Sequence, residues 1–248
     1  MRRFFAALCV AFFLCGASAY AEDLYAVQGD TLYVASVEDG SWRALSPSWT
    51  STQLLTAHGG SLYAIQGDNL YRANKADGSW EPLSTTWMGA TGLTASGSAL
   101  YGYQRGALYA VNPADGSWAP VPGAYAGTQH IAWAGGALMV IQGDTLYRVD
   151  VTTGAYETLP STYAGTTAVA GSASALFVVQ GDVLYRVDPT SGVFEALGGG
   201  YRGTTEMTFC AGSLFAVWQN NLYRINPTTG AYESLSTSWA GTSALTCS

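Results

Sequence analysis

The stretch LYAIQGDNLYR, residues 62–72, decides the fold. Two runs rich in aromatic and aliphatic residues flank Gly67-Asp68, a pair that suits a two-residue type II′ hairpin turn. The pattern recurs with a period of 38 residues, and its opening leucine falls at Leu24, Leu62, Leu100, Leu138, Leu176 and Leu214. A fixed period over six units predicts a repeat architecture.

The rest of the unit reads as two further strands. In the second unit, residues 69–74 form the return strand, 76–78 a turn and 79–83 a third strand. Residues 84–90 then form a linking loop, and 91–95 a fourth strand of small residues. Because no stretch has apolar residues at helical spacing over three turns, we expect essentially no helix.

Six units of four antiparallel strands predict an all-β fold, a six-bladed β-propeller. An open solenoid is the structural alternative, but its end units require atypical polar caps. The terminal units here resemble the others, and the repeats begin with the strand 24–28 and end with the strand 242–247. We expect these two strands to pair and close the ring.

The N-terminal segment has the features of an export signal. Arg2 and Arg3 precede the apolar run 4–14, and Ala19-Tyr20-Ala21 matches a cleavage site. The sequence therefore predicts a signal peptide over 1–21 and one propeller domain over 22–248, secreted or periplasmic. No later segment is long and apolar enough to suggest a membrane span.

Charge and cysteine content narrow the partners and the compartment. Without Arg2 and Arg3, seventeen acidic residues face eight basic ones, a net charge of −9 that argues against nucleic acid. Two cysteines remain after the signal, Cys210 and Cys247, on fourth strands that should be neighbours around the central tunnel. In an exported chain they predict a disulfide, with two unpaired buried thiols as the alternative.

No catalytic or metal-binding constellation is visible. His58 and His130 occupy different repeat positions, and no His/Cys cluster, nucleophile elbow or phosphate loop occurs. We therefore expect no enzyme, no metal and no cofactor. Three residues break the repeat symmetry, Glu206, Trp133 and Trp218, and a deep asymmetric pocket around Glu206 would favour an enzyme instead.

Two aromatic columns run through the repeats. The third strand carries one ring per unit: Trp42, Trp80, Trp118, Tyr156, Phe194 and Tyr232. The linking loop carries the other: Trp49, Trp87, Tyr125, Tyr163, Tyr201 and Trp239. Because sugar rings stack on aromatic side chains, the loop column is the candidate ligand-binding set. The alternative is that these rings plug the gaps between blades.

Polar columns accompany the rings. A glutamine ends the first strand at Gln28, Gln66, Gln104, Gln142 and Gln180, and Trp218 takes the sixth place. An arginine follows the second Leu-Tyr step at Arg72, Arg148, Arg186 and Arg224. The amide either reaches a ligand at one rim or caps backbone groups of a turn. The guanidinium either stacks on the residue opposite, Tyr63 in the case of Arg72, or donates to a ligand.

The units resemble tectonin repeats, the six-bladed propeller lectins of the tachylectin-1 type. Trp118-Ala119-Pro120-Val121-Pro122-Gly123 leads into Ile131, Gly135, Leu138, Ile141 and Leu146-Tyr147-Arg148, in the order of that repeat. The resemblance implies binding to bacterial surface glycans or lipopolysaccharide. We therefore predict a multivalent, non-catalytic carbohydrate-binding protein, a lectin or adhesin. The alternative partner is a protein, with the propeller as an extracellular or envelope scaffold.

Overall fold

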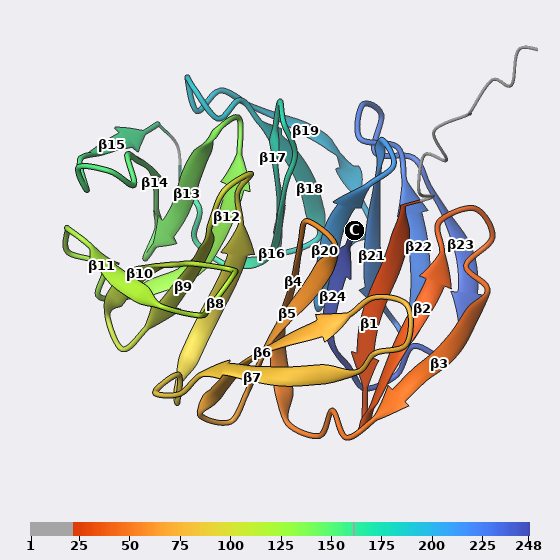
Figure 1. The fold of residues 1–248 in the computed structure, drawn as a ribbon. Helices are drawn as coiled ribbons and strands as arrows, with labels where there is room; N and C mark the ends of the chain where they lie inside the picture. Colours follow the sequence, from red (N-terminus) through yellow and green to blue (C-terminus); the bar gives the residue numbers. More distant parts are fainter. Residues whose placement is uncertain (1–21, 161) are drawn as a thin grey trace, which may run out of the picture.

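The computed structural model describes residues 22–160 and 162–248 as six four-stranded antiparallel sheets around a central axis (Figure 1). The predicted signal peptide, residues 1–21, lies outside the described residues. Within the described residues there is no helix, and so none that could cross a membrane. The chain is a six-bladed β-propeller, as the repeat pattern predicts.

Each blade runs from an inner strand at the axis to an outer strand at the rim. Blade 1 contains β24 (Thr242–Cys247), β1 (Asp23–Gln28), β2 (Thr31–Ser36) and β3 (Trp42–Pro47). Blade 2 contains β4 (Thr52–His58), β5 (Ser61–Gln66), β6 (Asn69–Asn74) and β7 (Trp80–Ser84). Blade 3 contains β8 (Ala90–Ala95), β9 (Leu100–Gln104), β10 (Ala107–Val111) and β11 (Trp118–Val121).

The other three blades have the same order. Blade 4 contains β12 (Thr128–Ala134), β13 (Ala137–Gln142), β14 (Thr145–Val149) and β15 (Tyr156–Leu159). Blade 5 contains β16 (Thr166–Gly171), β17 (Leu176–Gln180), β18 (Val183–Val187) and β19 (Phe194–Gly199). Blade 6 contains β20 (Glu206–Cys210), β21 (Ser213–Trp218), β22 (Asn221–Ile225) and β23 (Tyr232–Thr237).

The ring closes through its two end strands. β24 pairs antiparallel with β1, with Leu24 opposite Cys247, so blade 1 is built from both ends of the repeat array (Figure 1). Cys210 and Cys247 form the predicted disulfide, with their Cα atoms 5.4 Å apart. This bond joins the inner strand of blade 6 to the inner strand of blade 1, at the junction where the ring closes.

The core lies between adjacent blades because both faces of each sheet are covered. The strand next to the axis-lining strand is apolar on both faces; in β5, Leu62, Tyr63, Ala64 and Ile65 are all buried. The cluster between blades 6 and 1 contains Ala26, Phe215, Val217, Trp239 and Leu245. Six such clusters fill the six junctions between adjacent blades. A groove between two blades therefore ends on buried, close-packed side chains.

Candidate ligand grooves between the blades

All six aromatic residues of the linking loops are buried. Their side chains are 0–5% exposed, and each belongs to one inter-blade cluster. The backbone N–H of Trp87 donates to the Asp68 carbonyl of blade 2, at 3.0 Å, while the ring reaches blade 3. The loop rings therefore connect neighbouring blades. Their placement favours the packing alternative, and sugar binding by these rings stays a prediction.

The polar atoms of these rings mostly find partners within the protein. The indole N–H of Trp49 donates to Ser46 Oγ at 2.9 Å, and Trp87 and Trp239 make the same bond to a serine three residues upstream. The Tyr125 hydroxyl donates to the Pro122 carbonyl at 2.8 Å. Burial raises the pKa of Tyr163 and that of Tyr201 to about 12. The rings behave as core residues.

The rings exposed to solvent are those of the third strand. The side chains of Trp42, Trp80, Trp118, Tyr156, Phe194 and Tyr232 are 43–54% exposed. Each stands edge-to-face against the tyrosine of the neighbouring strand; the Tyr109 and Trp118 centroids, for example, are 5.0 Å apart at 79°. Every blade thus presents one partly covered tyrosine and one half-exposed ring on the same face.

A glutamine lies beside this aromatic pair in five blades. Nε2 of Gln104 donates to the carbonyls of Thr86 and Met88, at 2.7 and 2.8 Å, the two residues that flank Trp87. The other four glutamines hold the corresponding loops. Capping of backbone groups is therefore their structural role. Because both partners of the Gln104 amide group are carbonyls, its orientation is fixed, and Oε1 accepts no hydrogen bond from a described residue.

These side chains surround grooves between the blades. The groove of blade 3 has a volume of about 260 Å³ and is lined by Thr86, Trp87, Gln104, Arg105, Tyr109 and Trp118. The groove of blade 4 measures about 180 Å³ and is lined by Ala124, Tyr125, Val140, Gln142, Tyr147, Val149 and Tyr156. Each contains one buried loop ring, one glutamine and the aromatic pair.

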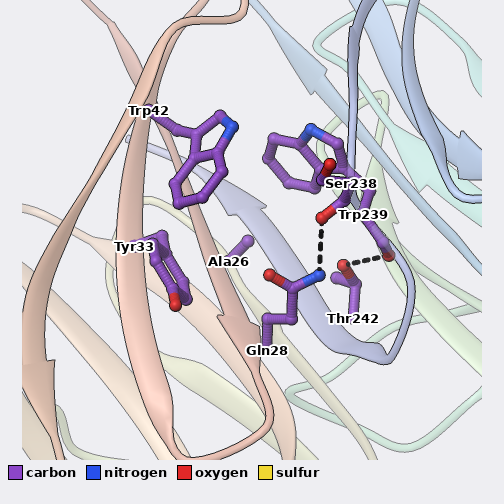
Figure 2. A pocket seen from close by; sticks show the side chains of 7 residues that line it. All are labelled: Ala26, Gln28, Tyr33, Trp42, Ser238, Trp239 and Thr242. Carbon is purple, nitrogen blue, oxygen red and sulfur yellow. Dashed lines mark hydrogen bonds between the residues drawn. The ribbon is translucent and has the colours of Figure 1, made fainter.

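The groove of blade 1 is a narrow slot of about 10 Å³ (Figure 2). Trp42 and Trp239 lie on its two sides, with Ala26 between them. The nitrogen of Gln28 faces the loop carbonyls, whereas its oxygen is turned toward Tyr33 and Trp42 (Figure 2). The grooves therefore offer an apolar face and a hydrogen-bond acceptor next to each other.

The opposite face of blades 2 and 6 carries an ion pair. Arg72 lies opposite Tyr63, as predicted, but its guanidinium pairs with Glu81 of β7 and also donates to the Ala114 carbonyl of blade 3 at 3.2 Å. Arg224 pairs with Glu233 in the same way. The repeat pattern predicted the arginine column without its glutamate partners, which lie on the next strand. These arginines support the packing of blades.

Glu206 lies in the inner strand β20. Burial raises the pKa of its carboxyl to about 8, and a backbone hydrogen bond with Leu245 opposes that rise. None of the grooves described above is lined by Glu206. The two histidines lie on other blades: His58 bonds to the Ser96 carbonyl at 3.0 Å, and His130 bonds to the Thr166 carbonyl at 3.1 Å.

The sequence pattern favoured the loop column over the third-strand column as the ligand-binding set. Both columns are visible as repeats, but the loop rings are the ones that adjacent blades cover. Position in the blade distinguishes the buried column from the exposed one. The third strand is the outermost strand, so a ring on it has a neighbouring strand on one side only and stays partly exposed. The exposed aromatic residues that the structure identifies are therefore those that come after the second turn of each unit.

Comparisons with known proteins support the fold and go no further. No family model matches the chain, and no curated protein matches it. A chain in the crystal structure of the nidogen/laminin complex superimposes with a TM-score of 0.78 and 11% identity, over 91% of this chain and 98% of that chain. At this identity the likeness concerns the propeller fold alone.

Proposed function

We propose that the protein is a multivalent, non-catalytic carbohydrate-binding protein whose ligands bind in the grooves between blades. One observation carries the proposal: a half-exposed ring stands beside an amide oxygen that no described residue engages, in five of the six blades. Sugar rings present apolar C–H faces to aromatic side chains and hydroxyl donors to acceptors. The groove offers both.

The repetition of the site favours a polyvalent ligand. Several similar weak sites on one rigid ring raise avidity by roughly 10²–10⁴ when the ligand repeats at matching spacing. Surface polysaccharides have such repeats. This supports the carbohydrate class that the tectonin-like repeats imply, and we propose bacterial surface glycans as the first class to test.

We also propose that the protein acts outside the cytoplasm. The disulfide between Cys210 and Cys247 supports this location, because such bonds persist in oxidising compartments. Detection of the chain beginning at Glu22 in a periplasmic or culture-medium fraction is the expected result. Retention of residues 1–21 on a cytoplasmic product would contradict it.

The experiment is a glycan-array screen of residues 22–248, with bacterial polysaccharides included. Trp118→Ala is the test variant, because the ring is half exposed; its removal costs the edge-to-face contact with Tyr109, about 0.5–1.5 kcal/mol, and the burial of the covered half of the ring. Val193→Ala is the control, since Val193 is an exposed apolar side chain that lines none of the grooves described. We expect binding to survive in the control, and to weaken in the test variant when it is measured at a temperature where that variant is fully folded.

A protein partner is the second candidate. The solved neighbour is a propeller in a protein–protein complex, and half-exposed aromatic side chains at a rim also suit protein contacts. A silent array from folded protein, together with capture of one defined protein that Trp118→Ala loses, would favour this second function over the first.

A further inference from the structure

The sixth groove is already filled. In blade 6, Trp218 stands where five blades have glutamine, and its side chain is 3% exposed. Its ring stacks on Tyr223, with centroids 3.6 Å apart and planes 11° apart. Tyr232 meets it edge-on at 5.3 Å, and Tyr201 lies at 5.4 Å. An indole therefore lies among the three rings that define this groove.

The same three positions in blade 3 enclose no such ring. These positions are Trp87, Tyr109 and Trp118. The ring of Tyr109 meets both indoles edge-on, with ring centroids 6.0 Å from Trp87 and 5.0 Å from Trp118. A cavity of about 260 Å³ lies beside them. The face of the second-strand tyrosine is the surface that Trp218 covers in blade 6.

We infer that Trp218 occupies the sixth groove in place of a ligand, so that this groove is closed, and that ligands of the open grooves lie as its indole does, flat against the second-strand tyrosine. This inference rests on the proposed function, because it assumes that the grooves are the ligand sites. It adds the binding pose and removes blade 6 from the set of sites, whose two roomy examples are the grooves of blades 3 and 4.

The turn after Trp218 holds the ring that the indole covers. This turn is Gln219-Asn220, with φ of 49° and 66°, and the open blade 3 has a turn of the same kind at Arg105-Gly106, with φ of 49° and 85°. The side-chain amide of Asn221 donates to the Tyr223 hydroxyl at 3.2 Å and to the Gln219 carbonyl at 3.1 Å. The tyrosine under the indole is thus held in place by the adjacent turn.

The lining also limits the chemistry of the ligand. In the groove of blade 4 the side chains are aromatic, aliphatic, hydroxyl or amide groups, with no charged side chain among the described lining residues. The glutamine oxygen accepts and cannot donate. A neutral ring with hydroxyl donors on its edge fits, and a carboxylated or phosphorylated ring does not. Blade 3 differs, because Arg105 lines its groove and would tolerate an acidic substituent.

The test counts sites with a probe that is independent of any glycan. The probe is 5-fluoroindole, measured by equilibrium dialysis and by ¹⁹F NMR on the folded chain 22–248. Trp218→Gln gives blade 6 the residue of the other blades, and Gln104→Trp gives blade 3 the residue of blade 6. We expect one bound probe more than wild type in the first variant and one fewer in the second.

Stability gives a second readout. In Trp218→Gln the new amide would donate to the carbonyls that flank Tyr201, as Gln104 does around Trp87, and so offset part of the loss of the buried indole. The Tm of this variant should therefore fall less than that of a variant in which a buried indole is lost without such a replacement. Trp87→Gln is the matched control, a buried indole in a linking loop, and should lower the Tm strongly. Equal losses in both variants, or an unchanged probe count in Trp218→Gln, would overturn the inference.

The outcomes separate this inference from the proposed function. A silent glycan array with the expected change in probe count would keep the groove closure and reject carbohydrate binding. Glycan binding with no gain of a site in Trp218→Gln would keep the proposed function and reject the role given to Trp218.

Discussion

The indole of Trp87 lies directly against the backbone of Gly102: a Cβ atom at position 102 would stand 2.4 Å from Cζ3 of the ring. Blade 4 has a different pair at the corresponding positions, with Tyr125 in the loop and Val140 on the strand. Loop tryptophans lie against Ala26, Ala64 or Gly102, and the loop tyrosines Tyr125 and Tyr163 lie with Val140 and Val178. The third loop tyrosine, Tyr201, lies with Ala216 in the blade that also buries Trp218. In five of the six blades, therefore, a larger loop ring goes with a smaller strand residue.

The first prediction rests on this pairing. Gly102→Val alone should destabilise the protein by about 1–3 kcal/mol, because the added side chain collides with Trp87. Combining it with Trp87→Tyr reproduces the pair of blade 4 and should recover part of the loss, with a coupling of about 0.5–3 kcal/mol. Denaturant unfolding of both single variants and the double variant measures this. Additive losses would show that the two residues do not share a site.

The second prediction concerns the closure of the ring. Replacing both Cys210 and Cys247 by serine should lower the free energy of unfolding by about 2–4 kcal/mol, because the bond restrains a loop in the unfolded chain. Intact-mass measurement with and without reductant establishes that the bond is present in wild type. Neither cysteine lines the grooves described, so ligand binding at a temperature where the variant is folded should not change. A wild-type Tm that is insensitive to reductant would contradict the stabilising role.

The third prediction tests the glutamine clamp. Gln104 is the most buried of the five glutamines, and its amide is the donor to the carbonyls of Thr86 and Met88. Gln104→Leu should therefore cost about 1–3 kcal/mol, because those carbonyls lose their partner. Gln104→Glu keeps the shape but removes both donors, and should cost at least as much at neutral pH. Thermal unfolding compares the two variants. If Gln104→Leu were as stable as wild type, water would replace the amide as the partner of the two carbonyls, and the clamp would not stabilise the fold.

The repeat alone predicted the architecture because the hairpin turn sets the register of the two strands that flank it. Gly67, first in its turn, has a φ of 60°, which suits the type II′ geometry expected of Gly-Asp. That turn places Tyr63 opposite Arg72, and the same register repeats at Met139 and Arg148. The number of strands, their pairing and the closing of the ring are encoded in such local signals and in where the repeats begin and end.

Which aromatic column is exposed to solvent could not be predicted in the same way, because exposure depends on the neighbouring blade. Trp87 and Trp118 look alike in sequence, as one aromatic per unit beside turn residues. Burial of the first depends on Gly102, on the next blade, and exposure of the second on its place on the outermost strand. The pairing of Trp with Ala or Gly, and of Tyr with Val, holds in five of the six blades and is the signal within the repeats that indicates burial of the loop rings.

Glu206 carries the one strongly raised carboxyl pKa among the described residues, about 8 against an ordinary value of 4.5, because burial in β20 disfavours its charged form. The unfolded chain loses this proton as pH rises through about 4.5, whereas the folded protein keeps it until about 8. The folded state therefore binds more protons across this window, and the free energy of unfolding falls as pH rises. The slope is at most about 1.4 kcal/mol per pH unit for one group.

We expect Glu206→Gln to remove this fall, since the amide keeps the shape of the protonated carboxyl without titrating. Urea unfolding at about pH 5, 6, 7 and 8, taken as the difference between wild type and variant, isolates the contribution. His130 changes the free energy of unfolding in the opposite direction, because burial lowers its pKa and the folded protein binds its proton less well than the unfolded chain. This contribution is the same in wild type and Glu206→Gln, so it cancels in the difference. The turn aspartates Asp77 and Asp115, whose pKa values are lowered by backbone and side-chain hydrogen bonds, titrate below this range. A wild-type stability that rises across this pH range relative to Glu206→Gln would show that the carboxyl is ionised in the fold and has a partner there.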